Sequence, residues 1–534
     1  MRKVIWLICV AAAWCGVAVA DEGHHHEELT QEQLGTVHFP VSCAPESQKT
    51  FEKGVALLHS FWYEESGKVF LEIQKQDPKC AMAYWGEGMS SWHQLWGRPE
   101  AKTIKKELDG LKKAQKLHAS TDRERDYIAA LKQFYTNGKL EHEKRAKAYS
   151  DAMEKVYQKY PDDHEAAAFY ALSLLAAEPE GDTTFANRKK AGAILEKLFD
   201  VEPNHPGIAH YLIHSYDKPQ LAELGLPAAR RYAKIAPFAP HAVHMPSHIF
   251  ARVGDWQASI ESNKASIEAT RKTSAMHMGG GGHQFHAMDF LIYAYLQSGR
   301  ECDAQKVIEE VKTLPDMEMG GERDMKSFAT SKFPAMYAVE LHQWKDAAAL
   351  PVVATWESGD RAYTYWARSM GNARSGNLAA AKKDLAEIEA ISKGKGTHNH
   401  DYDADFVDML YEEANAWVLR GDGKNDEAIA SLRKAADHED SVGDEQTSMP
   451  AREILADLLL ELNRPAVALV EYRSALKSNP KRFNGLYGAA RAAEMAGQSS
   501  QASEYYALLL KTCEGSNSER PELKKAKETA VAAK

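Results

Sequence analysis

Histidine pairs recur in two neighbouring segments of the chain. Residues 203–214 read PNHPGIAHYLIH and residues 237–248 read PFAPHAVHMPSH, so a shift of 34 residues aligns His210 and His214 with His244 and His248. Two prolines of each segment align as well, whereas most other positions differ. Residues four apart share one face of a helix, so each pair is expected to present two imidazoles side by side. Neutral imidazole is the commonest protein ligand for transition metals, and we therefore predict that all four histidines bind a metal.

The following segment extends this pattern. Gly299 occupies the turn position that Gly254 occupies one segment earlier, and the same offsets back from it reach three residues that align with His241, His244 and His248: His286, Asp289 and Tyr293. We predict Asp289 as a fifth metal ligand. We assign four further side chains to ligand binding around the metal: His241, His286, Asp217 and Tyr293. The sequence assigns no residue as catalytic.

The donor types leave the metal open between zinc and copper. Zinc accepts histidine together with one carboxylate, whereas the methionines beside the histidines are soft ligands that favour copper: Met245, Met276, Met278 and Met288. Methionine is also common filler in helical cores. Two other interpretations stay open: the histidines bind an anionic or peptide ligand without any ion, or repeat duplication copied them without a function. Four glycines at 279–282 either let the backbone fold closely over a ligand or form a flexible linker.

The elements that position these residues are predicted to be helices in consecutive pairs. Stretches such as 146–177, 256–270 and 451–477 space apolar residues three and four apart, and strand-like alternation is scarce. A short turn with Gly or Asn, followed by a helix with small residues, recurs at 254–269 (GDWQASIESNKASIEA), 376–390 (GNLAAAKKDLAEIEA) and 463–480 (NRPAVALVEYRSALKSNP). These segments resemble the tetratricopeptide repeat (TPR) family, which stacks helix–turn–helix units of about 34 residues.

The resemblance implies an all-α helical-repeat solenoid over most of residues 46–512. It also implies that the histidines line the concave groove in which such proteins bind a peptide, a protein partner or a small molecule. We divide the chain into a signal peptide (1–20), an N-terminal segment (21–45), a first repeat array with the histidine groove (46–300), a second array (301–515) and a flexible tail (516–534).

The first residues carry an export signal. Arg2 and Lys3 precede an apolar run that ends in Ala18-Val19-Ala20, which is typical of a cleaved secretory signal peptide, with the cut after Ala20. We therefore expect a periplasmic or secreted protein. In such a compartment Cys43 and Cys80 could form a disulfide, although buried free thiols are an equal alternative because spacing does not fix connectivity.

Composition and missing motifs exclude several functions. The net charge is −10, which argues against nucleic-acid binding, and no segment after the signal has eighteen uninterrupted apolar residues, so no membrane span is expected. A haem-attachment C-x-x-C, a P-loop and G-x-G-x-x-G are missing, so we expect neither haem nor a nucleotide. We predict an exported TPR-type binding scaffold with a histidine-rich metal site. The alternatives are a metal-dependent enzyme, either a hydrolase or a copper oxidase, and a metal-free interaction scaffold.

Overall fold

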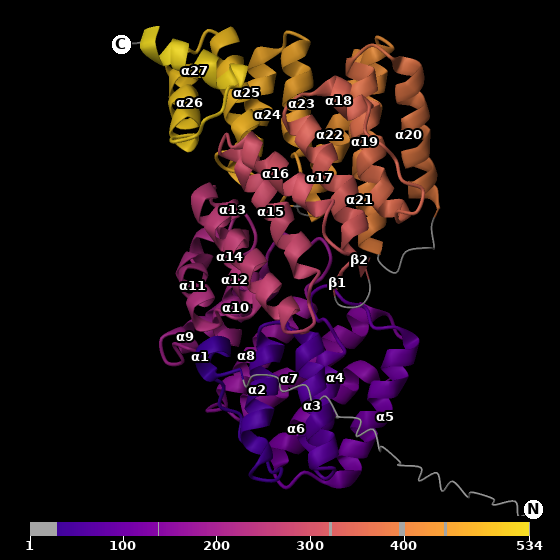
Figure 1. Cartoon of the computed structure of the whole chain (residues 1–534), viewed down its shortest axis with the longest axis vertical. Helices are drawn as coiled ribbons and strands as arrows, with labels where there is room; N and C mark the ends of the chain where they lie inside the picture. The colour runs from indigo at the N-terminus through magenta and orange to yellow at the C-terminus, as the bar shows by residue number, and fades with distance from the viewer. Residues whose placement is uncertain (1–28, 137, 320–322, 395–400, 443–445, 533–534) are drawn as a thin grey trace, which may run out of the picture.

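The computed structural model of the chain describes residues 29–136, 138–319, 323–394, 401–442 and 446–532 (Figure 1). Across these residues almost all regular structure is helical, and consecutive helices pack against each other. The prediction of an all-α, TPR-like arrangement of helix pairs is therefore confirmed. The predicted cleavage site after Ala20 lies outside the described residues. Within the described part, no helix is both long enough and apolar enough to cross a membrane.

The elements follow one another from the N-terminal to the C-terminal end of the molecule (Figure 1). Those before the first histidine pair are α1 (Gln31–Leu34), α2 (Ser47–His59), α3 (Tyr63–Gln76), α4 (Ala81–Ser90), α5 (Ala101–Leu117), α6 (Asp122–Tyr135), α7 (His142–Lys159), α8 (His164–Ala176) and α9 (Ala186–Phe199). The histidine-bearing region contains α10 (Pro206–Tyr216), α11 (Ala222–Ile235), α12 (Pro240–His244), α13 (Pro246–Arg252), α14 (Trp256–Ala275), α15 (His283–Gln297) and α16 (Glu301–Val311).

A two-stranded antiparallel hairpin, β1 (Glu318–Met319) and β2 (Arg323–Asp324), precedes the second half of the helices. That half contains α17 (Met325–Glu340), α18 (Trp344–Ala348), α19 (Ser358–Arg374), α20 (Leu378–Lys393), α21 (Asp401–Gly421), α22 (Asn425–Val442), α23 (Ala451–Glu461), α24 (Pro465–Ser478), α25 (Phe483–Met495), α26 (Ser499–Thr512) and α27 (Pro521–Ala532).

Local sequence signals define the turns between paired helices. Gly254 and Gly299, which the sequence analysis aligned, both have positive φ angles, +66° and +69°. Glycine adopts this left-handed conformation without the steric penalty of a side chain. At Gly254 a Cβ atom would also lie only 2.6 Å from the carbonyl oxygen of Pro480. The next helix, α14, begins beside Asp255, whose carboxylate accepts a hydrogen bond from the amide of Ala258 and caps the helix.

The hydrophobic core has two main parts. One contains buried side chains from Leu29 to Phe250 together with Met278, and the other contains buried side chains from Ala251 to Ala526. The change from the first part to the second falls within α13, between Phe250 and Ala251, with Met278 as a later member of the first part. The predicted boundary at residues 300–301 stays a prediction. The helices from α10 to α15 therefore contribute side chains to both parts of the core.

Both ends of the described chain are packed more firmly than the sequence indicates. The predicted flexible tail, 516–534, is wrong for most of its length, because residues 521–532 form α27 and Leu523 is 2% exposed. Leu523 and Ala526 are one helical turn apart, so both can face the neighbouring helix α26. At the other end, Cys43 and Cys80 form a disulfide that joins the N-terminal segment to the start of α4.

Candidate metal centre

The first histidine pair lies on α10, where both side chains face the same way. Pro206 begins this helix, and the ring of His205 accepts a hydrogen bond from the amide of Ile208 at its N-terminus. His210 is fully buried, and its Nδ1 lies 2.6 Å from the carbonyl oxygen of His59. Its Nε2 lies 3.0 Å from Nε2 of His214. The carbonyl can only accept, so Nδ1 of His210 carries the proton and Nε2 has a free lone pair.

The second pair lies on α12 and α13. Pro246 lacks an amide hydrogen and interrupts the hydrogen bonding, but Met245 keeps helical angles (φ −52°, ψ −36°), so His244 and His248 still share one face. The Nε2 atoms of His244 and His248 are 3.0 Å apart. The sequence analysis expected one continuous helix here, and the structure divides it in two without changing the spacing of the rings.

The outer nitrogens of the second pair are both held by acceptors. Nδ1 of His244 lies 2.7 Å from Oδ1 of Asn263, and Nδ1 of His248 lies 3.0 Å from Oδ2 of Asp217. The amide of Asn263 is oriented by its Nδ2, which donates to the carbonyl of Ser259 at 2.8 Å. Both Nδ1 atoms therefore carry protons, and in the neutral rings two Nε2 lone pairs face each other at 3.0 Å. That contact is repulsive unless a proton or a metal ion lies between the two nitrogens.

A third histidine completes each group. His241, on α12, joins His210 and His214, and the three ligand nitrogens lie within 4.8 Å of one another; we name these residues cluster 1. His286, on α15, joins His244 and His248 within the same limit; we name these residues cluster 2. His241 is only 5% exposed, and both of its buried ring nitrogens have no hydrogen-bond partner among the described residues. Buried polar atoms normally find a partner, so these two nitrogens are candidate donors to a metal ion or another ligand.

Burial favours the neutral form of five of the six cluster imidazoles. It lowers the pKa of His210 to about 3, against the opposing effect of the hydrogen bond to His59. Burial, and then the charges that neighbouring histidines would carry, also lowers the pKa of four other cluster residues well below the usual range: His214, His241, His244 and His286. Neutral imidazole is the form that binds metals, so the clusters present free donors at neutral pH.

Asp217 acts on cluster 2 through His248. Burial opposes its ionisation, but the hydrogen bond from His248 and the charges of His248 and Arg252 outweigh burial and lower the pKa of Asp217. Its other oxygen accepts from Nε of Arg252 at 3.1 Å and from the side-chain amide of Gln446. The carboxylate thus orients a candidate ligand from behind, which is a common arrangement around metal-binding histidines.

Asp289 and Tyr293, which align in sequence with His244 and His248, hydrogen-bond to groups outside both clusters. Asp289 accepts hydrogen bonds from Nζ of Lys332 at 2.9 Å and from the hydroxyl of Thr447 at 2.7 Å. The hydroxyl of Tyr293 accepts from Nη1 of Arg482 at 2.7 Å.

The residue after Asp289, Phe290, lies with its ring centre 4.5 Å from that of His248.

Aromatic side chains surround both clusters. The ring of Phe61 lies 4.3 Å from that of His210 and 5.4 Å from that of His214. Phe61 also has a positive φ of +54°, a strained conformation for a residue with a side chain. Phe290 lies 5.0 Å from His244. Sequence reasoning missed both rings, and also Asn263, because a single sequence does not show which residue of a neighbouring helix faces a histidine.

The glycine segment before α15 is docked against the start of α3. The amide of Gly279 donates to Oε1 of Glu65 at 2.6 Å, and its carbonyl accepts from Nε1 of Trp62 at 2.8 Å. The segment therefore packs against the protein through its backbone, and its folding over a ligand stays a prediction. The segment leads directly into His283, whose ring centre lies 5.2 Å from that of His241.

Two other residue groups have metal-like spacing but are otherwise satisfied. Glu165 accepts hydrogen bonds from His59 at 2.8 Å and from His205 at 2.9 Å, and the remaining nitrogen of each ring is also hydrogen-bonded. This buried network supports α10 from below, because the carbonyl of His59 holds His210. The second group contains Cys43 and Cys80, whose sulfur atoms are joined in the disulfide.

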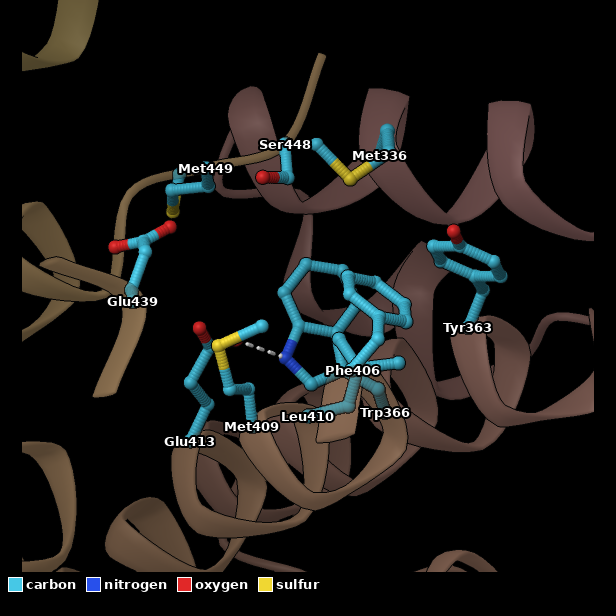
Figure 2. A pocket seen from close by; sticks show the side chains of 10 residues that line it. All are labelled: Met336, Tyr363, Trp366, Phe406, Met409, Leu410, Glu413, Glu439, Ser448 and Met449. Atoms are coloured by element: carbon cyan, nitrogen blue, oxygen red, sulfur yellow. Dashed lines mark hydrogen bonds between the residues drawn. The ribbon is translucent and has the colours of Figure 1, made fainter. Parts of the chain in front are cut away.

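A small hollow lies apart from the histidines, between α17, α19, α21 and the segment before α23. Figure 2 shows that aromatic and methionine side chains surround it and that Glu413 hydrogen-bonds to Trp366, whose Nε1 donates at 2.7 Å. Burial raises the pKa of Glu413 to about 8, against the opposing effect of that hydrogen bond. The carboxyl group is therefore largely protonated at neutral pH, which suits a structural role in an apolar environment.

Comparisons with known proteins concern the fold alone. No protein-family model and no curated protein matches the chain. Similar solved structures include the human IFIT1 dimer with m7Gppp-AAAA, at 13% identity over 81% of this chain and 90% of that chain, with a TM-score of 0.37. A tetratricopeptide repeat protein from Parabacteroides merdae is 14% identical over 55% of this chain and 98% of its own, with a TM-score of 0.28. The P58(IPK) TPR domain is 13% identical over 70% of this chain and 99% of its own, with a TM-score of 0.21.

Proposed function

We propose that this chain is an exported TPR-like binding protein that holds transition-metal ions in clusters 1 and 2. The observation that carries the proposal is His241, whose two buried ring nitrogens have no partner among the described residues and lie beside His210 and His214. The facing Nε2 atoms of His244 and His248 support the same conclusion for cluster 2. A metal ion at each cluster satisfies the lone pairs that the protein leaves facing one another.

The spacing suits such ions. Two nitrogens each bound at about 2.0 Å to one tetrahedral zinc ion would be about 3.3 Å apart. The Nε2 atoms of each pair are 3.0 Å apart, so small side-chain movements would be enough. Hydrogen bonds from Nδ1 to an acceptor further favour metal binding, because they fix the tautomer with Nε2 free. His210, His244 and His248 all have such a bond.

The groove around the clusters is proposed to receive a peptide or protein partner, or a small molecule. A second candidate function is a metal-dependent enzyme, because three histidines leave a metal position open for water or substrate. The partial exposure of His214, His248 and His286 favours this candidate, since solvent can approach that side of each cluster. Asp217 already accepts hydrogen bonds from His248 and Arg252, so it is poorly placed to act as a general base in a hydrolase.

Elemental analysis tests the proposal. The chain is produced without a purification tag, with His24, His25 and His26 replaced by alanine so that the N-terminal histidines add no binding. It is then loaded with zinc or copper and desalted. We expect about two ions per chain, about one after His214→Ala or His248→Ala, and about two after the control His164→Ala, which changes a half-exposed histidine paired with Glu202.

The control and the folding check decide the result. Circular dichroism and thermal melting show whether each variant keeps its helical fold. If the folded protein retains less than about one-tenth of an ion per chain, the metal-binding proposal is refuted and the metal-free scaffold remains as the alternative. Equal metal content in His164→Ala, His214→Ala and His248→Ala would place the ion elsewhere.

A further inference from the structure

The two clusters are adjacent parts of one site. His241 belongs to cluster 1 and His244 to cluster 2, yet both lie on the five-residue helix α12 and their ring centres are 6.1 Å apart. Asp217, the residue that follows α10, lies 3.0 Å from Nδ1 of His248 in cluster 2, and α10 packs against α13, so the groups are also close on the other side. Ions bound to the two clusters would therefore be neighbours.

The donor atoms are unusual in carrying no charge. Among the described residues, the groups within mutual ligand distance in both clusters consist of histidines alone. Paired hydrolytic metal sites, in which two ions clamp the attacking and leaving oxygens, are normally built with carboxylates that offset the charge of the ions and bridge them. Carboxylate, carbonyl and water ligands suit magnesium, calcium and manganese, whereas imidazole suits zinc and copper. A neutral donor set in a buried, aromatic-lined site also favours an ion of low charge, because burying charge without compensation is costly. Cu(I) is the ion that meets both conditions.

We propose that clusters 1 and 2 hold a pair of copper ions that binds dioxygen between them. This inference rests on the proposed function, since it requires that the clusters bind metal. Each copper has three imidazole ligands and an open position. The partly exposed residues His214, His248 and His286 provide the side from which a small molecule enters. Phe61 and Phe290 cover the clusters with apolar rings and keep charged ligands out.

The redox step balances within the site. Each of two Cu(I) ions gives one electron to dioxygen, which becomes a bridging peroxide dianion while both ions become Cu(II). No proton and no further reductant are needed, because the two electrons return to copper when dioxygen leaves. Neutral imidazoles stay bound throughout, since the acceptors on their Nδ1 atoms hold three of the six rings in place: His210, His244 and His248.

The test uses the full chain with the N-terminal histidines replaced, loaded with Cu(I) under argon and then exposed to dioxygen. We expect two copper ions per chain, uptake of one dioxygen for two copper ions, and a new charge-transfer absorption that disappears under renewed argon. We also expect the oxygenated protein to show less than about one-tenth of its copper as a Cu(II) electron paramagnetic resonance signal, because two bridged Cu(II) ions couple magnetically.

Single-cluster variants supply the decisive comparison. His214→Ala and His248→Ala should each keep about one copper ion, take up no dioxygen reversibly, and give a full Cu(II) signal after chemical oxidation. Two copper ions that give a full two-ion signal in the oxygenated protein would overturn the inference while leaving the metal-binding function intact. Binding of two zinc ions in preference to copper would do the same. Absence of any bound metal in folded protein would instead overturn the proposed function itself.

Discussion

Asn263 offers the sharpest test of how the protein prepares its histidines for a metal. Its Oδ1 accepts a hydrogen bond from Nδ1 of His244 at 2.7 Å, whereas Asn263 itself is not one of the candidate ligands. Asn263→Leu keeps the approximate shape of the side chain and removes the acceptor. Without metal, His244 can carry its proton on Nε2 and donate a hydrogen bond to His248, so the metal-free protein loses little stability.

The metal-bound state cannot make this adjustment. There Nε2 is occupied by the ion, so the Nδ1 proton must point at leucine without a partner. A buried unsatisfied donor costs about 1–3 kcal/mol, which corresponds to roughly 5- to 150-fold in affinity. The hydroxyl of Ser247, 3.4 Å from Nδ1, is a weak substitute and favours the lower part of that range. We therefore expect cluster 2 to bind metal about tenfold more weakly in Asn263→Leu.

The assay isolates cluster 2 by working in the His214→Ala background. A chromophoric chelator of known affinity competes for the ion, and thermal melting of the metal-free protein is measured in parallel. Asn263→Asp serves as the control, because it restores an acceptor and should bind at least as tightly as the parent. Affinities of Asn263→Leu and its parent that agree within threefold would refute this account of the tautomer.

Three further results are expected. Glu413→Gln should gain stability relative to the parent as pH rises from about 5 to about 8, by roughly 1.4 kcal/mol per pH unit. The reason is that burial raises the folded pKa of Glu413 to about 8, so ionisation over this range favours the unfolded chain. Urea melts at the two ends of the range measure the stability difference, and a constant difference would contradict the prediction. Cys80→Ser should lower the free energy of unfolding by about 4 kcal/mol, since the disulfide closes a loop with a sequence separation of 37, and reduction of the parent should reproduce the loss in calorimetry. Removing metal with a chelator should lower the melting temperature of the parent but not that of His214→Ala/His248→Ala, whereas equal shifts would show that the chelator acts elsewhere.

The fold could be predicted from the sequence because helix pairs are encoded by patterns of residues that are close together in the chain. Apolar spacing of three and four, and glycines such as Gly254 at the turns, depend only on residues close together in the chain. The tail was mispredicted for a related reason. The packing of Leu523 against α26 depends on a neighbouring helix, and its Lys-rich surroundings conceal the apolar face.

The candidate site was predictable only where the repeat geometry was regular. The spacing of four residues correctly places His210 beside His214 and His244 beside His248, and the turn glycines lead to His286. Asp289, predicted as a ligand, instead accepts hydrogen bonds from Lys332 and Thr447, and the ring of the next residue, Phe290, lies beside His248. Partners on other helices, such as Asn263, depend on tertiary packing that one sequence does not record.

The short helix α12 gives the two clusters a common mechanical origin. His241 and His244 are three residues apart on it, so an ion that fixes one ring also fixes the backbone that carries the other. Binding of the first ion orders α12 and carries the entropy cost of doing so. The second ion then binds to a helix that is already ordered, without that cost. Occupancy of the clusters should therefore be positively cooperative, and the protein should pass from empty to doubly loaded over a narrow range of metal concentration.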